Sequence, residues 1–348
     1  LAVTAAVGFG YFYVTLPALN PHAGEFYSFL GLLCAVYVVC VFLLSGAPHD
    51  NVIRTPKEKL REWLKFIKSR CLPVGLLFVA VVVIAAVGNV VSMPLLRAAA
   101  YRDLLTVQTG DFASDVAQIS FNEIPTLDRT SAEFLGDRQM GTLSDMVSQF
   151  EYSGDSTQIN YQGRPVRVAP IAYADLFKWL TNRGQGLPAY VVVDMVTQEA
   201  TVTRLPQGMK YSFSEPLNRN IVRHLRFHYP TMMFSTPEFE IDENGHPWWI
   251  APRVVKTIGL FGGTDIQGAV LVDAVTGQSQ YYKEVPTWVD TLYVPELIMQ
   301  QYDYHGTLVH GFINSLLGQR DVTVTTQGYN YIALNDDVYM YTGVTSAN

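Results

Sequence analysis

The sequence predicts an α-helical membrane anchor of three transmembrane helices, followed by an exported α+β domain built from repeated units of an antiparallel β-hairpin and a helix. Two observations lead to this fold class. Three long apolar runs occupy most of the first 96 residues, and two short motifs recur in the same order in the remainder of the chain. The distribution of charged residues separates the same two regions.

The apolar runs extend from Leu1 to Leu19, from Phe26 to Leu44 and from Leu72 to Leu96. Each is close to the ~20 residues that a helix needs to cross ~30 Å of hydrocarbon. A buried helix of a soluble protein can be equally apolar, but three such runs in so short a stretch favour membrane spans. No charged segment precedes the first run and two more runs follow it, which argues against a signal peptide.

Orientation follows from the positive-inside rule, which counts lysines and arginines in short loops. Seven of them lie between Arg54 and Arg70, whereas the loop from Asn20 to Glu25 has none. We therefore expect a multi-pass plasma-membrane protein with a cytoplasmic N-terminus and an extracellular C-terminal domain.

The basic loop is also predicted to be helical, over residues 55–70. Leu60, Trp63, Leu64 and Ile67 fall on one helical face, with lysines and arginines around them. This pattern is typical of a short amphipathic helix that lies along the inner membrane surface and is attracted to anionic lipid. Membrane lipid is thus one expected partner.

Charge and cysteine content limit what the exported region can do. From Arg97 onward there are 17 basic and 27 acidic residues, which disfavours binding to nucleic acid because phosphates require a positive surface. All three cysteines lie in or beside the apolar runs, so the exported region has neither a disulfide nor a cysteine nucleophile.

The most informative feature of the exported region is an approximate repeat. G-R-P-V-R-V-A-P begins at Gly163 and G-H-P-W-W-I-A-P begins 82 residues later; Y-V-V-V-D-M-V-T-Q begins at Tyr190 and A-V-L-V-D-A-V-T-G begins 79 residues later. Glycine and aspartate between β-branched runs are typical of hairpin turns. The predicted turn residues are Gly163, Pro165, Asp194, Gly245, Pro247, Asp273 and Gly277.

The second motif resembles the PepSY domain of exported bacterial proteins, whose hairpin ends in a Val-Asp-Ala-x-Thr-Gly turn. Asp273, Ala274, Thr276 and Gly277 match this turn, and Asp194 and Thr197 match it with glutamine in place of the glycine. The chain also resembles a group of multi-span Gram-positive membrane proteins with PepSY-like exported repeats. The likeness covers residues 157–283 and implies binding or inhibitory modules of the cell envelope, some linked to peptidase control, that are not enzymes.

These observations divide the chain into five parts. They are a transmembrane region with its cytoplasmic helix (1–96), a stalk and mixed α/β segment (97–156), a first PepSY-like unit (157–235), a second unit (236–320) and the start of a third, incomplete unit (321–348).

A helix predicted from Pro216 to Tyr229 carries the candidate partner-binding residues. His224 and His228 are four residues apart, but the H-E-x-x-H arrangement and further ligands are missing, so we expect no metal there. With the histidines lie Arg219, Arg223 and Arg226, the one concentrated positive patch of an acidic domain. It could contact the membrane surface, an anionic wall polymer or an acidic partner; alternatively, it is a solvated helix face whose arginines pair with acids.

No segment carries a catalytic or cofactor-binding signature. The glycine-rich stretch from Gly259 to Thr264 lacks the Lys-Ser/Thr of a phosphate loop and is predicted to be a flexible connection, and no serine lies in a G-x-S-x-G elbow. We therefore expect a cell-envelope binding or scaffold protein without a cofactor or catalytic residues. The alternatives are an accessory subunit of a larger membrane assembly and a cell-wall hydrolase; titratable groups that converge in a deep pocket would favour the hydrolase.

Overall fold

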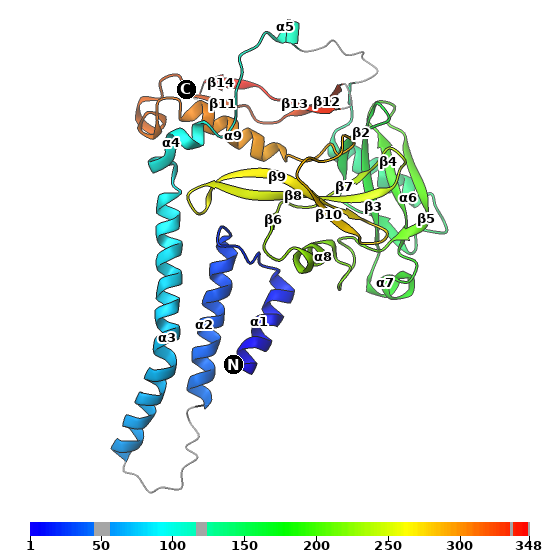
Figure 1. The fold of residues 1–348 in the computed structure, drawn as a ribbon. Helices are drawn as coiled ribbons and strands as arrows, with labels where there is room; N and C mark the ends of the chain where they lie inside the picture. Colours follow the sequence, from blue (N-terminus) through cyan, green and yellow to red (C-terminus); the bar gives the residue numbers. More distant parts are fainter. Residues whose placement is uncertain (45–55, 116–123, 335–336, 347–348) are drawn as a thin grey trace.

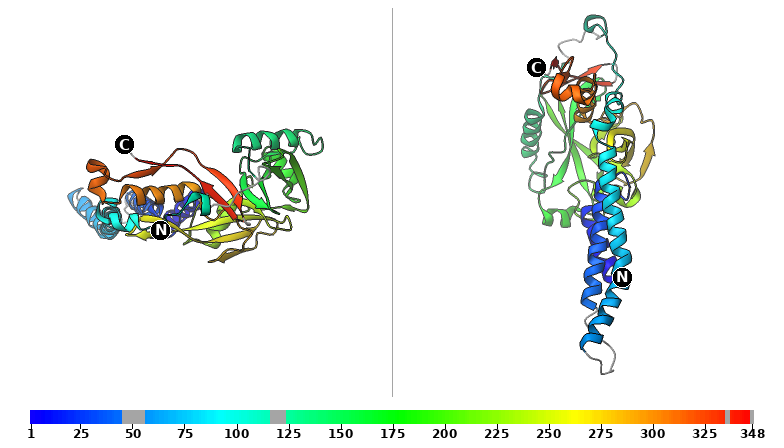
Figure 2. Two further views of the ribbon diagram at one scale, coloured as in Figure 1. Left: turned by 90° about the horizontal axis from the view of Figure 1, so that it is seen from above. Right: turned by 90° about the vertical axis from the view of Figure 1, so that its left-hand side faces the viewer.

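The computed structural model describes residues 1–44, 56–115, 124–334 and 337–346. Three helices run side by side away from a mixed α/β domain (Figures 1 and 2): α1 (Ala2–Thr15), α2 (Gly24–Leu44) and α3 (Pro56–Val91). Within them, Gly24–Leu43 and Leu60–Val91 are long and apolar enough to cross a membrane, with 20 and 32 residues. Only 17% and 11% of their most apolar windows are buried inside the structure.

The first helix is shorter than the apolar run from Leu1 to Leu19 that was expected to form a span. α1 has 14 residues, or about 21 Å at ~1.5 Å per residue. It ends because Leu16 adopts a left-handed conformation, with φ 51°, and Pro17 follows. A residue before proline is disfavoured in the helical region, so the helix stops there.

The amphipathic helix predicted at 55–70 is not a separate element. Thr55 lies outside the described residues, and from Pro56 one helix of 36 residues continues into the apolar run, with Pro73 in its interior. Proline removes a single helical hydrogen bond, and apolar runs favour helical backbone because it satisfies its own polar groups. The basic segment therefore extends the axis of α3 and does not lie across it.

Two antiparallel sheets form the domain, after the helices α4 (Pro94–Arg102), α5 (Phe112–Asp115) and α6 (Arg129–Gly141). The first sheet has the order β1-β3-β4-β5, with β2 also paired to β3. Its strands are β1 (Phe150–Tyr152), β2 (Thr157–Tyr161), β3 (Arg164–Tyr173), β4 (Leu187–Asp194) and β5 (Ala200–Met209).

The second sheet has the order β10-β9-β8-β6, with β7 also paired to β8. Its strands are β6 (Met233–Phe234), β7 (Glu238–Ile241), β8 (Pro247–Ile258), β9 (Gly262–Asp273) and β10 (Ser279–Tyr282). Helix α7 (Leu176–Asn182) lies between β3 and β4 in the chain, and α8 (Ile221–His228) lies between the two sheets in the chain.

The two sheets repeat one strand register. In the first, Val166 pairs with Asp194, and in the second, Trp248 pairs with Asp273. These pairs differ by 82 residues on one strand and 79 on the other, the offsets of the sequence motifs. Gly163 and Gly245 occupy the preceding hairpin turns with φ values of 76° and 75°, which L side chains rarely adopt.

The aspartate turns also share one geometry. Asp194 Oδ1 accepts hydrogen bonds from the amides two and three residues later, at 2.9 and 2.8 Å. Asp273 Oδ1 does the same at 2.8 and 3.0 Å. Gln198, with φ 62°, occupies the position that Gly277 fills with φ 76°.

The prolines of the repeated motif lie inside strands, although they were predicted to be turn residues. Pro165 pairs with Asn160 and Pro247 pairs with Ile241. Their carbonyls accept the amides of the residues that follow Asp194 and Asp273, both at 3.1 Å. Each proline therefore links the glycine hairpin of its sheet to the aspartate turn of the same sheet.

One hydrophobic core joins the two sheets, so the predicted units 157–235 and 236–320 form a single packed body. The first sheet contributes Ile159, Val168 and Val191, the second contributes Phe239, Trp249 and Val272, and α8 contributes Ile221 and Leu225. A sheet buries its apolar face only against another element. Neither unit would cover its core alone.

The C-terminal segment makes its own small sheets beside α9 (Pro295–Thr307) and a short π-helix (Asn314–Gly318). Strand β11 (Thr323–Thr325) pairs with β14 (Val344–Ser346), and β12 (Asn330–Leu334) pairs with β13 (Asp337–Tyr341). Within the described part of residues 321–348, no strand joins either larger sheet. The segment thus differs from the opening of a third unit that was expected there.

The β8–β9 turn docks the domain onto the helices. Ser92 Oγ, just after α3, accepts hydrogen bonds from the amides of Leu260 and Phe261 at 2.9 and 3.0 Å. His22 Nδ1 donates to the Leu260 carbonyl at 2.8 Å, and the Phe261 ring packs edge-on against Tyr27. The glycine-rich stretch, expected to be a flexible connection, is therefore a fixed contact.

Candidate functional site: a polar cleft between the two sheets

Helix α8 begins at Ile221, later than the helix predicted from Pro216, so it carries Arg223 and Arg226 but not Arg219, and it lies on the end of α1. Arg226 is buried, and its guanidinium donates to the carbonyls of Leu16 and Met232 at 2.9 and 2.6 Å. Arg223 Nε donates to the Tyr13 carbonyl at 3.3 Å, and its guanidinium lies 4.3 Å from the centre of the Tyr13 ring. The last carbonyls of a helix have no intrahelical donor and carry partial negative charge, so cations stabilise them.

The three arginines therefore do not form an open patch. Arg219 Nη1 donates to the Arg183 carbonyl at 2.7 Å, and the closest carboxylate to Arg226 is that of Glu25, at 4.0 Å. The alternative prediction was a solvated helix face whose arginines pair with acids. Arg226 is buried rather than solvated, although it does pair with Glu25. The partners of Arg223 and Arg226 are mainly backbone carbonyls, which no sequence pattern identifies.

The two histidines are structural. His224 is buried and its Nε2 donates to the Gly277 carbonyl at 2.9 Å, while His228 Nδ1 donates to the His224 carbonyl at 2.8 Å. Burial lowers the pKa of His224 to about 4, and the nearby His228 acts in the same direction. His224 is thus neutral at physiological pH. No group of three or more potential metal ligands occurs in the described ranges.

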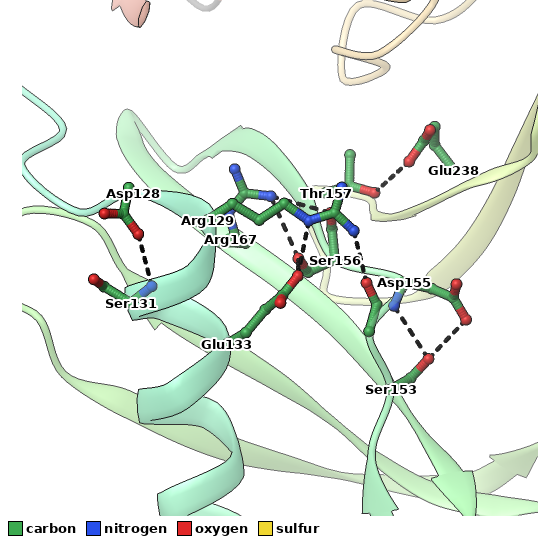
Figure 3. Close-up of polar contacts among 11 residues, drawn as sticks. Asp128, Arg129, Ser131, Glu133, Ser153, Asp155, Ser156, Thr157, Arg167 and Glu238 are labelled. Carbon is green, nitrogen blue, oxygen red and sulfur yellow. Dashed lines mark hydrogen bonds and ion pairs between the residues drawn. The ribbon is translucent and has the colours of Figure 1, made fainter.

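A polar cleft of about 560 Å³ lies where the edges of the two sheets meet. Its walls come from β2, β7, the start of α6, residues 290–298 and the start of β12. Figure 3 shows its polar floor, where side chains from α6, β2, β3 and β7 converge. Segments more than 150 residues apart in the chain thus share one site.

Two arginines hold the floor of this polar cleft. Arg129 forms an ion pair with Glu133 at 2.8 Å and donates to the Gly154 carbonyl at 2.9 Å (Figure 3). Arg167 is buried and donates to the Ser156 carbonyl at 3.1 Å. The first arginine is largely exposed, so it is the one that a ligand can reach.

Strand β7 forms the opposite side, with Glu238 lining the cleft and Glu240 buried behind it. Glu238 and Glu240 are two residues apart in the strand, so they share one face of it. Apolar Phe239, between them, points to the other face. Glu238 Oε2 accepts the hydroxyl of Thr157 at 3.1 Å. Burial raises the pKa of Glu238, and the Thr157 hydroxyl opposes this shift.

Glu240 is fully buried and fixes the wall of the cleft. Its carboxylate accepts hydrogen bonds from the amides of Asp290 and Thr291 at 3.1 and 2.8 Å. Burial raises the pKa of Glu240 to about 7, although these donors oppose the shift. Asp290 in turn accepts the Asn160 amide at 2.6 Å, which ties the wall to β2.

The cleft contains titratable groups, the feature named above as favouring a hydrolase, but its geometry is not that of an activated nucleophile. Ser156 Oγ donates to Glu133 at 3.2 Å, which resembles a nucleophile and its base. Ser156 is buried, however, and Glu133 already forms an ion pair with Arg129. A ligand in the cleft would contact carboxylates and hydroxyls on a rigid frame, which suits binding.

The charge of the lining is negative. The lining contains two arginines and four carboxyl groups: Arg129, Arg167, Asp128, Glu238, Asp290 and Glu296. Sequence reasoning did not identify this site. The available signal was the pair of glutamates in E-F-E-I, where acids alternate with apolar residues in a strand whose two faces are both covered.

Comparison with known proteins gives no relative. No protein-family model matches the chain, and neither a curated protein nor a solved structure does. The function is therefore inferred from the site and its placement.

Proposed function

We propose that this protein is a membrane-anchored binding protein of the cell envelope, whose polar cleft holds an extended basic segment of a partner protein. The observation that carries the proposal is the lining of the cleft, with four carboxylates against two arginines, set in walls fixed by buried hydrogen bonds. A preformed site loses little conformational entropy on binding, and complementary charge gives it specificity. The anionic wall polymer considered above would be repelled.

In this proposal α1, α2 and α3 all lie in the membrane, and the domain is outside. Packing supports the inclusion of α1, since Tyr11 stacks on Phe29 of α2 and Phe12 contacts the same ring. The seven basic residues between Arg54 and Arg70 support a cytoplasmic position for the α2–α3 connection.

We further propose that the two hairpin pairs are PepSY-like units. The support is the shared register and the shared aspartate turn, which are the features on which the resemblance rests. If the units are PepSY-like, a binding or inhibitory role toward an envelope protein is the expected consequence.

A binding experiment with the full chain in lipid nanodiscs tests the proposal. Two fluorescent peptides of equal length carry lysines or glutamates at the same positions, and fluorescence anisotropy measures their affinities. The lysine peptide should bind, and Glu296→Lys at the exposed rim should weaken it about tenfold, or about 1.4 kcal/mol. Glu284→Lys, at an exposed residue that does not line the cleft, makes the same change in net charge and should have little effect.

Three outcomes would overturn this assignment. Equal weakening by both substitutions would mean that the peptide senses only net charge. Partner retention that depends on outward-facing residues of α2 and α3, and not on Glu296, would indicate an accessory subunit. Cleavage of a wall peptide or glycan that Glu238→Gln abolishes would indicate a hydrolase.

A further inference from the structure

An exposed apolar surface covers one face of α7. Leu176, Phe177 and Leu180 have exposed fractions of 59%, 76% and 47%, whereas Trp179 on the opposite face is buried and donates Nε1 to Glu215 at 2.7 Å. Such a group of large apolar side chains on one short helix marks an interaction surface.

The position of α7 in the fold indicates what its exposed apolar face contacts. Figure 1 shows α7 below the sheets, on the side from which α1, α2 and α3 run away, at the level of the end of α1. The second view in Figure 2 places α7 on the same side of the domain. The exposed face of α7 lies opposite the buried Trp179, on the side of the domain from which the helices leave.

Hydrogen bonds connect α7 to α1. Tyr13 near the end of α1 donates its hydroxyl to Asn218 at 3.3 Å, and the neighbouring Arg219 donates to the Arg183 carbonyl, which caps α7. Together with the docking of the β8–β9 turn on Ser92, these contacts fix the height of α7 relative to the helices. Leu217, beside Asn218, is also exposed and extends the apolar surface toward α1.

Resting on the proposed membrane anchor, we infer that α7 inserts Leu176, Phe177 and Leu180 into the headgroup and acyl-chain boundary of the outer leaflet. Large apolar side chains on one face of a helix can lie at this depth without spanning the bilayer. The domain would thus have a second attachment to the bilayer, some distance from the three helices.

Lipid quenching of a site-specific label tests the inference in the reconstituted full chain. Cys34, Cys40 and Cys71 are first replaced by serine or alanine, and an environment-sensitive fluorophore is attached to a single new cysteine. Phe177→Cys is compared with Phe134→Cys on α6, an equally apolar position with 69% exposure that lies away from the helices. Spin-labelled lipid with a shallow nitroxide should quench the label at 177 at least threefold more than the label at 134.

A third label separates failure of this inference from failure of the proposed function. Leu77→Cys lies within the apolar part of α3 and should be quenched by a deep nitroxide. Quenching at 77 together with equal, weak quenching at 134 and 177 would overturn the α7 contact alone. Loss of quenching at 77 would overturn the membrane anchor itself. Pyrene excimers at 177 without lipid quenching would assign the face to a second copy of the chain and would also overturn the inference.

Discussion

Replacing Arg226 with alanine should loosen the domain from the end of α1. The side chain donates from Nε to Leu16 and from Nη1 to Met232, with a longer contact to Pro230 at 3.4 Å. Hydrogen bonds to charged groups contribute about 1.5–3 kcal/mol each, and acceptors left buried without a donor add to the loss. The Glu25 ion pair adds little, since that carboxylate is half exposed. We expect a loss of about 3 kcal/mol.

Hydrogen exchange and thermal unfolding of the full chain in detergent measure this loss. The Leu19 amide donates to the Pro230 carbonyl at 2.8 Å, across the same junction. Its exchange should accelerate roughly a hundredfold if opening the junction becomes easier by about 3 kcal/mol. The melting temperature should fall by about 6–12 °C, at ~2–4 °C per kcal/mol for a domain of this size.

Two variants serve as controls. Arg226→Lys keeps the charge but not the planar guanidinium. Its melting temperature and Leu19 exchange rate should lie between those of wild type and Arg226→Ala. Arg219→Ala removes an arginine from the same region whose bond to Arg183 is exposed, and it should change the melting temperature by less than about 2 °C. Unchanged Leu19 exchange in Arg226→Ala would refute the argument that this guanidinium holds the junction.

Two further predictions concern the sheets. The pKa of Glu240 is raised from 4.5 in the unfolded chain to about 7, so its contribution to stability is present at low pH and is lost as pH rises through this range. Wild type should be about 2 kcal/mol less stable at pH 8 than at pH 5 from this group, and Glu240→Gln should flatten that dependence in thermal melts; an unchanged slope would contradict the assignment. Gly277→Ala should destabilise by about 2 kcal/mol because its Cβ would overlap the Tyr211 ring at positive φ. Gln198→Gly at the equivalent turn should be neutral or stabilise by up to about 1 kcal/mol. Chemical denaturation in which Gly277→Ala stabilises or Gln198→Gly destabilises would show that the two turns are not equivalent.

Local pattern was enough for the elements whose cause is local. The apolar runs located α2 and α3, because span length and hydrophobicity are properties of consecutive residues. The glycines at 163 and 245 and the aspartates at 194 and 273 indicated turns, because positive φ and side-chain bonds to nearby amides depend on a few adjacent residues. The end of α1 is equally local, since Pro17 stops it, although the apolar run alone suggested a longer helix.

Tertiary structure decided what the charged residues do. The sequence placed Arg219, Arg223 and Arg226 close together in the chain, but Arg223 and Arg226 also bind carbonyls of α1 and its end, about 210 residues away, which only folding brings together. The polar cleft is likewise absent from any local pattern, because Glu238 and Arg167 meet only when the edges of two sheets pack on one core. Burial sets the charge and partners of an ionisable side chain, and burial is a property of the whole packed chain.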